Sequence, residues 1–169
     1  MRQMGKQRLT IKRLRMIFLT AALAFLTTAG VWATASRLVT SIVTNPLTGV
    51  ALDGYDPVSY FTEVAPLQGA PEFEFGWRGV PWYFASAANR DVFARTPEVY
   101  APMFGGYGVM ALARGFLSAG NPRVYEVLGG RLFVFYSSGN RDAFLALPRD
   151  AFLNAERQWD DLSKTLVGD

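Results

Sequence analysis

The side chains of this chain that could do chemistry are carboxylates, tyrosines, methionines and arginines, because its 169 residues include no histidine and no cysteine. Those two absences exclude disulfides, Cys/His zinc sites, thiol nucleophiles and every catalytic triad that uses imidazole as its base. No pair of carboxylates has a spacing that suggests general acid and base catalysis. We therefore expect a protein that is not an enzyme, and no cofactor is predicted.

Two weak sets of candidate metal ligands remain. Asp53 and Asp56 could hold a hard cation together with backbone carbonyls, although Asp before Pro in "DGYDP" is also ordinary turn chemistry. Met103 and Met110 could bind Cu(I) through their thioethers, helped by Tyr107, although isolated methionines more often fill a core. The sequence leaves the ligand and the packing interpretations open.

Aromatic side chains make up 14% of the residues and are the other candidates for binding. Strand alternation in "PWYFA" sends Trp82 and Phe84 to the face opposite Tyr83, so some aromatics should pack inside while others line a groove or an exposed patch. Such a patch would suit a protein partner or a small planar ligand. The candidates for this groove are Tyr55, Trp82, Tyr83, Phe104 and Tyr107.

Two predicted hairpins, each followed by a helix, must position these residues. The period-2 stretch "EFEFGW" at 72–77 predicts a half-buried strand with its two glutamates in solvent. "RGVP" then turns into a second strand, and Ser86 is placed to cap a helix over 87–96. The second hairpin, "VYEVLGGRLFVFY" at 124–136, turns at a Gly-Gly dipeptide that tolerates a type I′ turn.

The chain closes with a predicted amphipathic helix within "DAFLNAERQWDDLSKTL", residues 150–166. No internal repeat is evident at a solenoid period. The likeness of "NRDVF" at 89–93 to "NRDAF" at 140–144 is interpreted as the same helix-capping task performed twice, because both stretches follow a strand and open a helix.

The first 36 residues are predicted to be a signal peptide or a single transmembrane anchor. After the cluster "KRLR" come 21 uncharged residues, Met16 to Ser36. The small residues Ala33 to Ala35 would suit a signal peptidase, whereas the length of the run reaches the ~20 residues needed to cross a bilayer. With either fate, the positive-inside rule places the body outside the cytoplasm. In a bacterial cell this would be the envelope, with the body anchored at the inner membrane and facing the periplasm, or free in the periplasm.

Charge separates this leader from the body. The first 35 residues hold six basic residues and no acidic one, which leaves 11 basic and 14 acidic residues in the rest of the chain. A basic surface for nucleic acid is therefore not expected. We predict a linker over 37–50, with turns at its Asn-Pro and Thr-Gly dipeptides, and a folded domain over 51–166.

Four motifs carry a resemblance to a known family. "ALDGYDPVSYFTE", "WRGVPWYFASAANRDVFARTPEVYAP", "GGYG" and "GRLFVFYS" occur in the order found in YHS domains, and the chain resembles the exported bacterial type with its G-Y-D-P-V-x-Y-F signature. The resemblance covers residues about 49 to 165. It implies an α+β fold related to treble-clef-like metal knuckles, in which a small antiparallel sheet of hairpins packs with short helices. Metal binding is commonly inferred for the family, and catalysis is not a family property.

The residues that the family uses as metal ligands differ in this chain. Metal-type relatives have cysteines where this sequence has Ser59, Ala85 and Asn89, and exported relatives often have one at the position of Gly108. A hydroxyl, a methyl and an amide cannot replace thiolates for a soft metal. We therefore expect a non-catalytic interaction or accessory module, such as an accessory subunit of a membrane protein complex. The alternative is a periplasmic carrier of a metal or small ligand that uses ligands other than cysteine.

Overall fold

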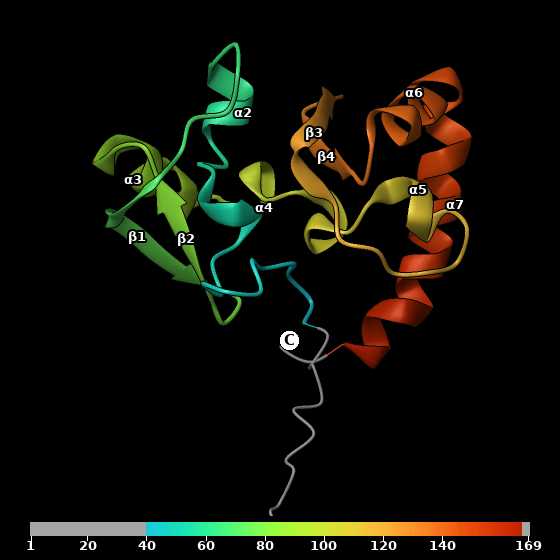
Figure 1. Ribbon diagram of the computed structural model, residues 1–169, viewed down its shortest axis with the longest axis horizontal. Helices are drawn as coiled ribbons and strands as arrows, with labels where there is room; N and C mark the ends of the chain where they lie inside the picture. The colour runs from blue at the N-terminus through green and yellow to red at the C-terminus, as the bar shows by residue number, and fades with distance from the viewer. Residues whose placement is uncertain (1–39, 167–169) are drawn as a thin grey trace, which may run out of the picture. The chain divides into compact units, whose positions relative to one another are not determined.

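The computed structural model describes residues 40–166 (Figure 1). This part of the chain is α+β and contains two small antiparallel sheets and several short helices, which confirms the predicted fold class at that level. The leader predicted over 1–36 lies outside the described residues. Among residues 40–166, no helix combines the length and the apolar character that a membrane span requires.

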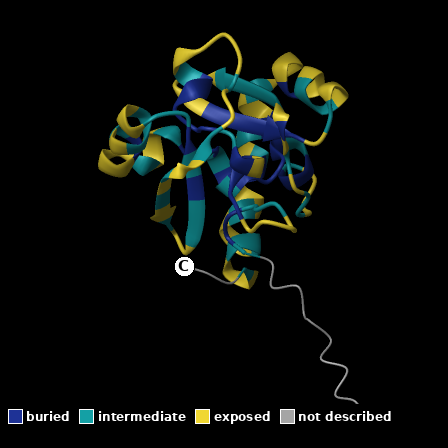
Figure 2. Ribbon diagram, turned by 60° about the vertical axis from the view of Figure 1, so that its left-hand side comes forward, coloured by how far each residue is buried: buried dark blue, intermediate teal, exposed yellow. Residues whose placement is uncertain are grey.

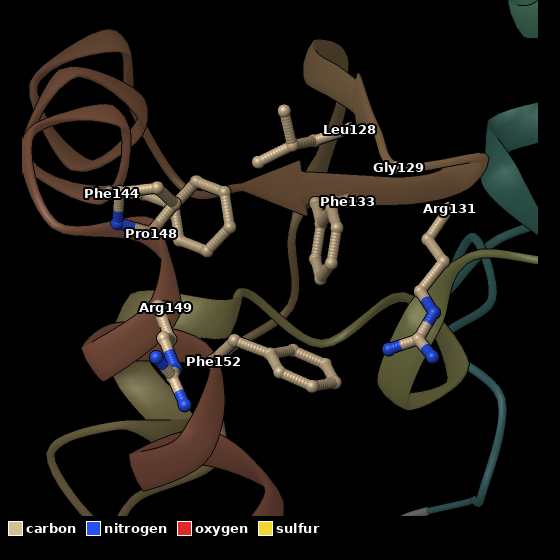
Figure 3. A pocket seen from close by; sticks show the side chains of 8 residues that line it. All are labelled: Leu128, Gly129, Arg131, Phe133, Phe144, Pro148, Arg149 and Phe152. Carbon is tan, nitrogen blue, oxygen red and sulfur yellow. The ribbon is translucent and has the colours of Figure 1, made fainter.

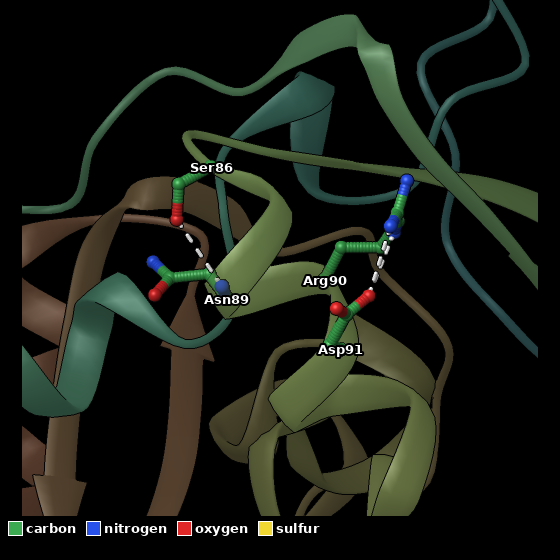
Figure 4. A network of polar contacts seen from close by, with 4 residues as sticks. All are labelled: Ser86, Asn89, Arg90 and Asp91. Atoms are coloured by element: carbon green, nitrogen blue, oxygen red, sulfur yellow. Dashed lines mark hydrogen bonds and ion pairs between the residues drawn. The ribbon is translucent and has the colours of Figure 1, made fainter.

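The first hairpin pairs β1 (Ala70–Trp77) with β2 (Val80–Phe84) in antiparallel register. As the alternation predicts, the aromatic residues of β1 are half-buried, namely Phe73, Phe75 and Trp77. The two glutamates of β1, Glu72 and Glu74, are exposed. The turn places Arg78 and Gly79 at positive φ. Helix α3 (Ala87–Arg95) begins where expected, with the Ser86 hydroxyl accepting the Asn89 N–H at 3.2 Å (Figure 4).

The second hairpin pairs β3 (Asn121–Leu128) with β4 (Arg131–Phe135), and Gly129 and Gly130 both have positive φ in its turn, as predicted. Helix α6 (Ser138–Ala146) and the long helix α7 (Pro148–Leu162) follow. The remaining short elements are η1 (Leu52–Gly54), α2 (Ser59–Thr62), α4 (Pro97–Tyr100), η2 (Met103–Gly106), α5 (Val109–Leu112) and η3 (Ser163–Thr165).

The two hairpins and their helices repeat one structural unit at an offset of 51 residues, and we call residues 52–100 the N-terminal unit and residues 103–151 the second unit. The bounds of β3, β4 and α6 are those of β1, β2 and α3 moved by this offset. Both hairpins also break register at the same place, between Ala70 and Glu74 in one and between Asn121 and Tyr125 in the other. The likeness of "NRDVF" to "NRDAF" therefore marks equivalent positions of a repeated unit, and not only a shared capping task.

The β3–β4 hairpin lies between two hydrophobic clusters. Leu132 and Val134 belong to the first cluster, which is built mainly from the N-terminal unit, whereas Phe133 and Phe135 belong to the second, with α5, α6 and α7. The apolar run of β4 is therefore buried on both faces, in contrast to the half-exposed β1 (Figure 2).

The segment expected to be a linker packs into the body. Ile42 is buried in the first cluster, and the N–H of Val43 donates to the carbonyl of Gly105 at 2.8 Å. Residues 41–43 are consequently part of the folded unit, and the second unit's η2 is held against them.

Candidate functional site

A fully buried carboxylate lies at the centre of the positions where the family resemblance implies metal ligands. One oxygen of Asp56, Oδ1, accepts the N–H groups of Val58 at 2.8 Å and Ser59 at 3.4 Å. The other, Oδ2, accepts the N–H of Ala85 at 2.8 Å and the side-chain amide of Asn89 at 2.7 Å. The structure thus brings Ser59, Ala85 and Asn89 together around one carboxylate. We call this arrangement the Asp56 hub.

The hydroxyl of Ser59 extends the Asp56 hub to a further loop. It donates to the backbone carbonyl of Asp56 at 2.6 Å and accepts the N–H of Leu67 at 2.9 Å. The hub therefore connects the turn before α2, the loop that follows α2 and the junction between β2 and α3.

The Asp56 hub does not suit a metal ion. Its ring of groups around the carboxylate consists of N–H donors, which have no lone pair to offer a cation, and Ser59, Ala85 and Asn89 supply no thiolate. Within residues 40–166, no group of three or more Asp or Glu side chains is arranged to hold a metal.

The other candidate metal ligands occupy different surroundings. The Asp53 carboxylate accepts the side-chain amide of Asn45 at 3.2 Å. Met103 and Met110 are partly buried against the second cluster. Tyr107 is buried in that cluster, and its hydroxyl donates to the carbonyl of Thr40 at 2.7 Å. Burial raises the pKa of the Tyr107 hydroxyl. The thioethers and the phenol therefore contribute to core packing.

Three of the aromatic candidates lie in the interior. Trp82 is fully buried, and its indole N–H donates to the carbonyl of Trp77 at 3.2 Å. Phe104 and Tyr107 are buried against Trp159, with ring centroids 5.8 and 5.9 Å away. Trp82 therefore packs within the first cluster, and Phe104 and Tyr107 pack within the second. Tyr83 is partly exposed on the face opposite Trp82, as the alternation predicts.

Tyr55 is the aromatic candidate that lines a polar pocket, with a volume of about 570 Å³. Its hydroxyl accepts the Nε–H of Arg123 at 2.7 Å. The pocket therefore joins the N-terminal unit to β3 and offers both a carboxylate and a guanidinium. Its lining residues are Asp53, Tyr55, Gln68, Ala119, Gly120, Asn121, Arg123 and Tyr136.

Sequence reasoning missed an apolar pocket of about 340 Å³ between the turn of the second hairpin and helices α6 and α7 (Figure 3). Phe133 forms its floor with Phe144 and Phe152, at centroid distances of 5.0 and 5.9 Å. The guanidinium of Arg131 lies 5.1 Å from the Phe152 ring centroid. The full lining is Leu128, Gly129, Arg131, Phe133, Phe144, Pro148, Arg149 and Phe152, which we call the hairpin pocket.

The only sequence signal for the hairpin pocket is the alignment of the two units at their turns. Leu128 and Arg131 flank the second turn at the positions of Trp77 and Val80 beside the first.

Comparisons with family models, with curated proteins and with solved structures find no match to this chain. The YHS resemblance therefore stays a prediction from the motifs.

Proposed function

We propose that this chain is a YHS-like, non-catalytic binding module of the bacterial cell envelope, exported or tethered by its N-terminal segment, and that it serves as an accessory subunit of a membrane protein complex. The observation that carries the proposal is the Asp56 hub. Hydrogen bonds to one carboxylate connect the segments that thiolates would connect through a metal, so this site serves to hold the scaffold together.

The energetics support a structural role for the Asp56 hub. Burying an unpaired carboxylate is costly, but each hydrogen bond to a charged group contributes about 1.5–3 kcal/mol, and Asp56 accepts four N–H groups. Such a hub stabilises the frame without presenting a reactive group to solvent. Function would then belong to surfaces outside the hub, where the pockets lie.

The test is native mass spectrometry of the full-length chain, taken from its own membranes in mild detergent. We expect a co-migrating protein at fixed stoichiometry and no tightly bound metal. A control chain that keeps only residues 1–39 separates binding by the leader from binding by the described domain. Stoichiometric metal in the native protein would overturn the proposal, and a full-length chain that migrates alone would remove the accessory role.

The second candidate is a periplasmic carrier of a small ligand or metal, and the polar pocket favours its small-ligand form. Asp53 and Arg123 offer opposite charges there, with Tyr55 between the two units. A shortened chain beginning near Ser36 and carrying a small-molecule adduct would support it. The adduct should disappear in Arg123→Gln and persist in Arg95→Gln, an exposed arginine of α3; an adduct that persists in both contradicts this site.

A further inference from the structure

The hairpin pocket is open at a place that the N-terminal unit fills with a tryptophan. In the N-terminal unit, Trp77 packs against Trp82 and Phe93 at centroid distances of 5.6 and 5.8 Å. The 51-residue offset makes Leu128, Phe133 and Phe144 the equivalents of these three residues. The paired rings beneath are alike, since Trp82 and Phe93 are 5.2 Å apart and Phe133 and Phe144 are 5.0 Å apart.

Leu128 is too small to cover the floor that Trp77 covers in the other unit. It remains 41% exposed at the edge of the hairpin pocket, while Phe133 and Phe144 are almost fully buried beneath. Phe152 packs edge-on against Phe133 and covers part of this floor, so the apolar surface that a ligand can remove from water belongs to Leu128 and to the partly exposed Phe152. The pocket volume, about 340 Å³, is at the lower end of the roughly 300–1,000 Å³ of ligand sites and suits a short body better than a long chain.

Two arginines give the rim of the hairpin pocket a positive charge that the N-terminal unit lacks. Arg131 stands at the position of Val80, and Arg149 at that of Glu98. Figure 3 shows the two guanidinium groups on opposite sides of the Phe152 ring, and Arg131 stacks on that ring.

Neither rim arginine has a carboxylate partner within the described residues. The ion pairs recorded between residues 40 and 166 involve Arg90, Arg141 and Lys164. An unpaired, planar guanidinium beside an apolar floor is suited to a carboxylate, which it can bind through two parallel hydrogen bonds.

We propose that the hairpin pocket binds a small amphipathic carboxylate. An aryl or short acyl body lies between Leu128 and Phe152, above the buried rings of Phe133 and Phe144, and the carboxylate is bound by Arg131 or Arg149. This inference rests on the proposed function, because it assigns a ligand class to the binding module.

The experiment is an NMR titration of the full-length chain in mild detergent, with empty micelles as the blank. The probe is 4-phenylbutyrate, and its uncharged partner is 4-phenylbutanamide. We expect saturable shifts of the backbone amides of Gly129 and Arg131 with a Kd of about 0.1–1 mM for the carboxylate. The amide should bind at least about fivefold more weakly. Equal binding of both probes, or shifts that do not saturate, would overturn the assignment.

Variants test the floor and the rim separately. Leu128→Trp copies the N-terminal unit and should abolish the shifts while leaving the thermal midpoint unchanged or higher. Arg131→Gln with Arg149→Gln should weaken carboxylate binding about tenfold, to the level of the amide, while Arg95→Gln should change nothing. Unaltered binding by the Leu128→Trp variant contradicts the proposed location of the ligand.

The outcomes separate this inference from the proposed function. A chain that co-migrates with a protein partner but does not bind the probe retains the accessory role and loses the ligand assignment. A chain that migrates alone but binds the probe saturably, with the expected response of Leu128→Trp, retains the ligand assignment and loses the accessory role.

Discussion

The side chain of Asp56 connects segments of the chain that lie far apart in the sequence. Its carboxylate is fully buried, yet each oxygen accepts two N–H groups, so hydrogen bonds replace the water that burial removes. Asn89 supplies the shortest of these bonds, at 2.7 Å, from a position where the resemblance implies a cysteine.

Replacing Asp56 by Asn should lower the free energy of unfolding by about 3 kcal/mol. The substituted amide removes the charge and, in place of Oδ2, would oppose the N–H groups of Ala85 and Asn89. Urea unfolding of the full-length chain in mild detergent measures the change. Asp91→Asn, which breaks an exposed ion pair with Arg90, is the control and should cost less than about 1 kcal/mol. A chelator that destabilises the native chain would contradict the metal-free hub.

Gly105 is a position where the backbone leaves no room for a side chain. Its φ is +62°, and an added Cβ would overlap the carbonyl oxygen of Ser41. We expect Gly105→Ala to cost more than about 3 kcal/mol, because strain and overlap act together. Gly76→Ala, in β1 with no heavy atom within 4 Å, should cost less than about 1 kcal/mol. Equal midpoints for the two variants in urea unfolding would contradict the packing of residues 41–43.

At the scale of elements, the repeated unit predicts that equivalent positions do equivalent work. Ser86 and Ser137 begin the two nine-residue helices, and their hydroxyls accept the N–H groups of Asn89 and Asn140 at 3.2 and 3.4 Å. The hairpins share their bulge and their two-residue turn with positive φ. Differences between the units, such as Trp77 against Leu128, are therefore the places where function can diverge.

Ser86→Ala and Ser137→Ala should each cost about 1 kcal/mol, the usual loss for an N-cap hydroxyl. Thermal unfolding of the two variants, alongside Ser138→Ala as an exposed control in the first turn of α6, measures the effect. A loss of similar size for Ser138→Ala, or no loss for one of the two caps, would show that the units do not share their capping.

Across the described part of the chain as a whole, Tyr60 connects the N-terminal unit to the second unit. Its hydroxyl donates to the carbonyl of Pro122 at 2.9 Å, and its ring meets Tyr125 edge-on at 4.8 Å. Burial raises the pKa of Tyr60 well above its usual value, with smaller contributions from nearby tyrosines and aspartates. Its neutral, protonated form is thus the one that the fold requires.

Stability should decline at alkaline pH because of this raised pKa. The contribution of Tyr60 is fully present below the unfolded pKa of about 10 and is lost as the pH rises above it, at about 1.4 kcal/mol per pH unit. Tyr60→Phe should cost about 1 kcal/mol at pH 7 and reduce this slope. Urea unfolding from pH 8 to 11.5 tests the expectation, and an unchanged slope in Tyr60→Phe would contradict it. Adding Tyr107→Phe to the Tyr60→Phe variant should reduce the loss of stability per pH unit further, since burial also raises the pKa of Tyr107.

Local sequence patterns predict the hairpins, the two Ser-capped helices and the amphipathic α7, because alternation, turn dipeptides and capping depend on residues within a few positions of one another. Gly129-Gly130 is the clearest instance. The motifs also indicated that Ser59, Ala85 and Asn89 belong together. The anion between them was not predicted, since Asp56 before Pro57 has an equally good explanation as a turn residue.

Contacts between distant segments become visible only in the folded chain. Asp56 and Ala85 are 29 positions apart, and Tyr55 and Arg123 are 68 apart. Whether Trp82 lines a groove or fills a core depends on what packs over its strand, which local pattern does not record. The hairpin pocket depends likewise on a ring that is present at Trp77 and missing at Leu128, and that difference matters only once both hairpins have folded onto equivalent aromatic floors.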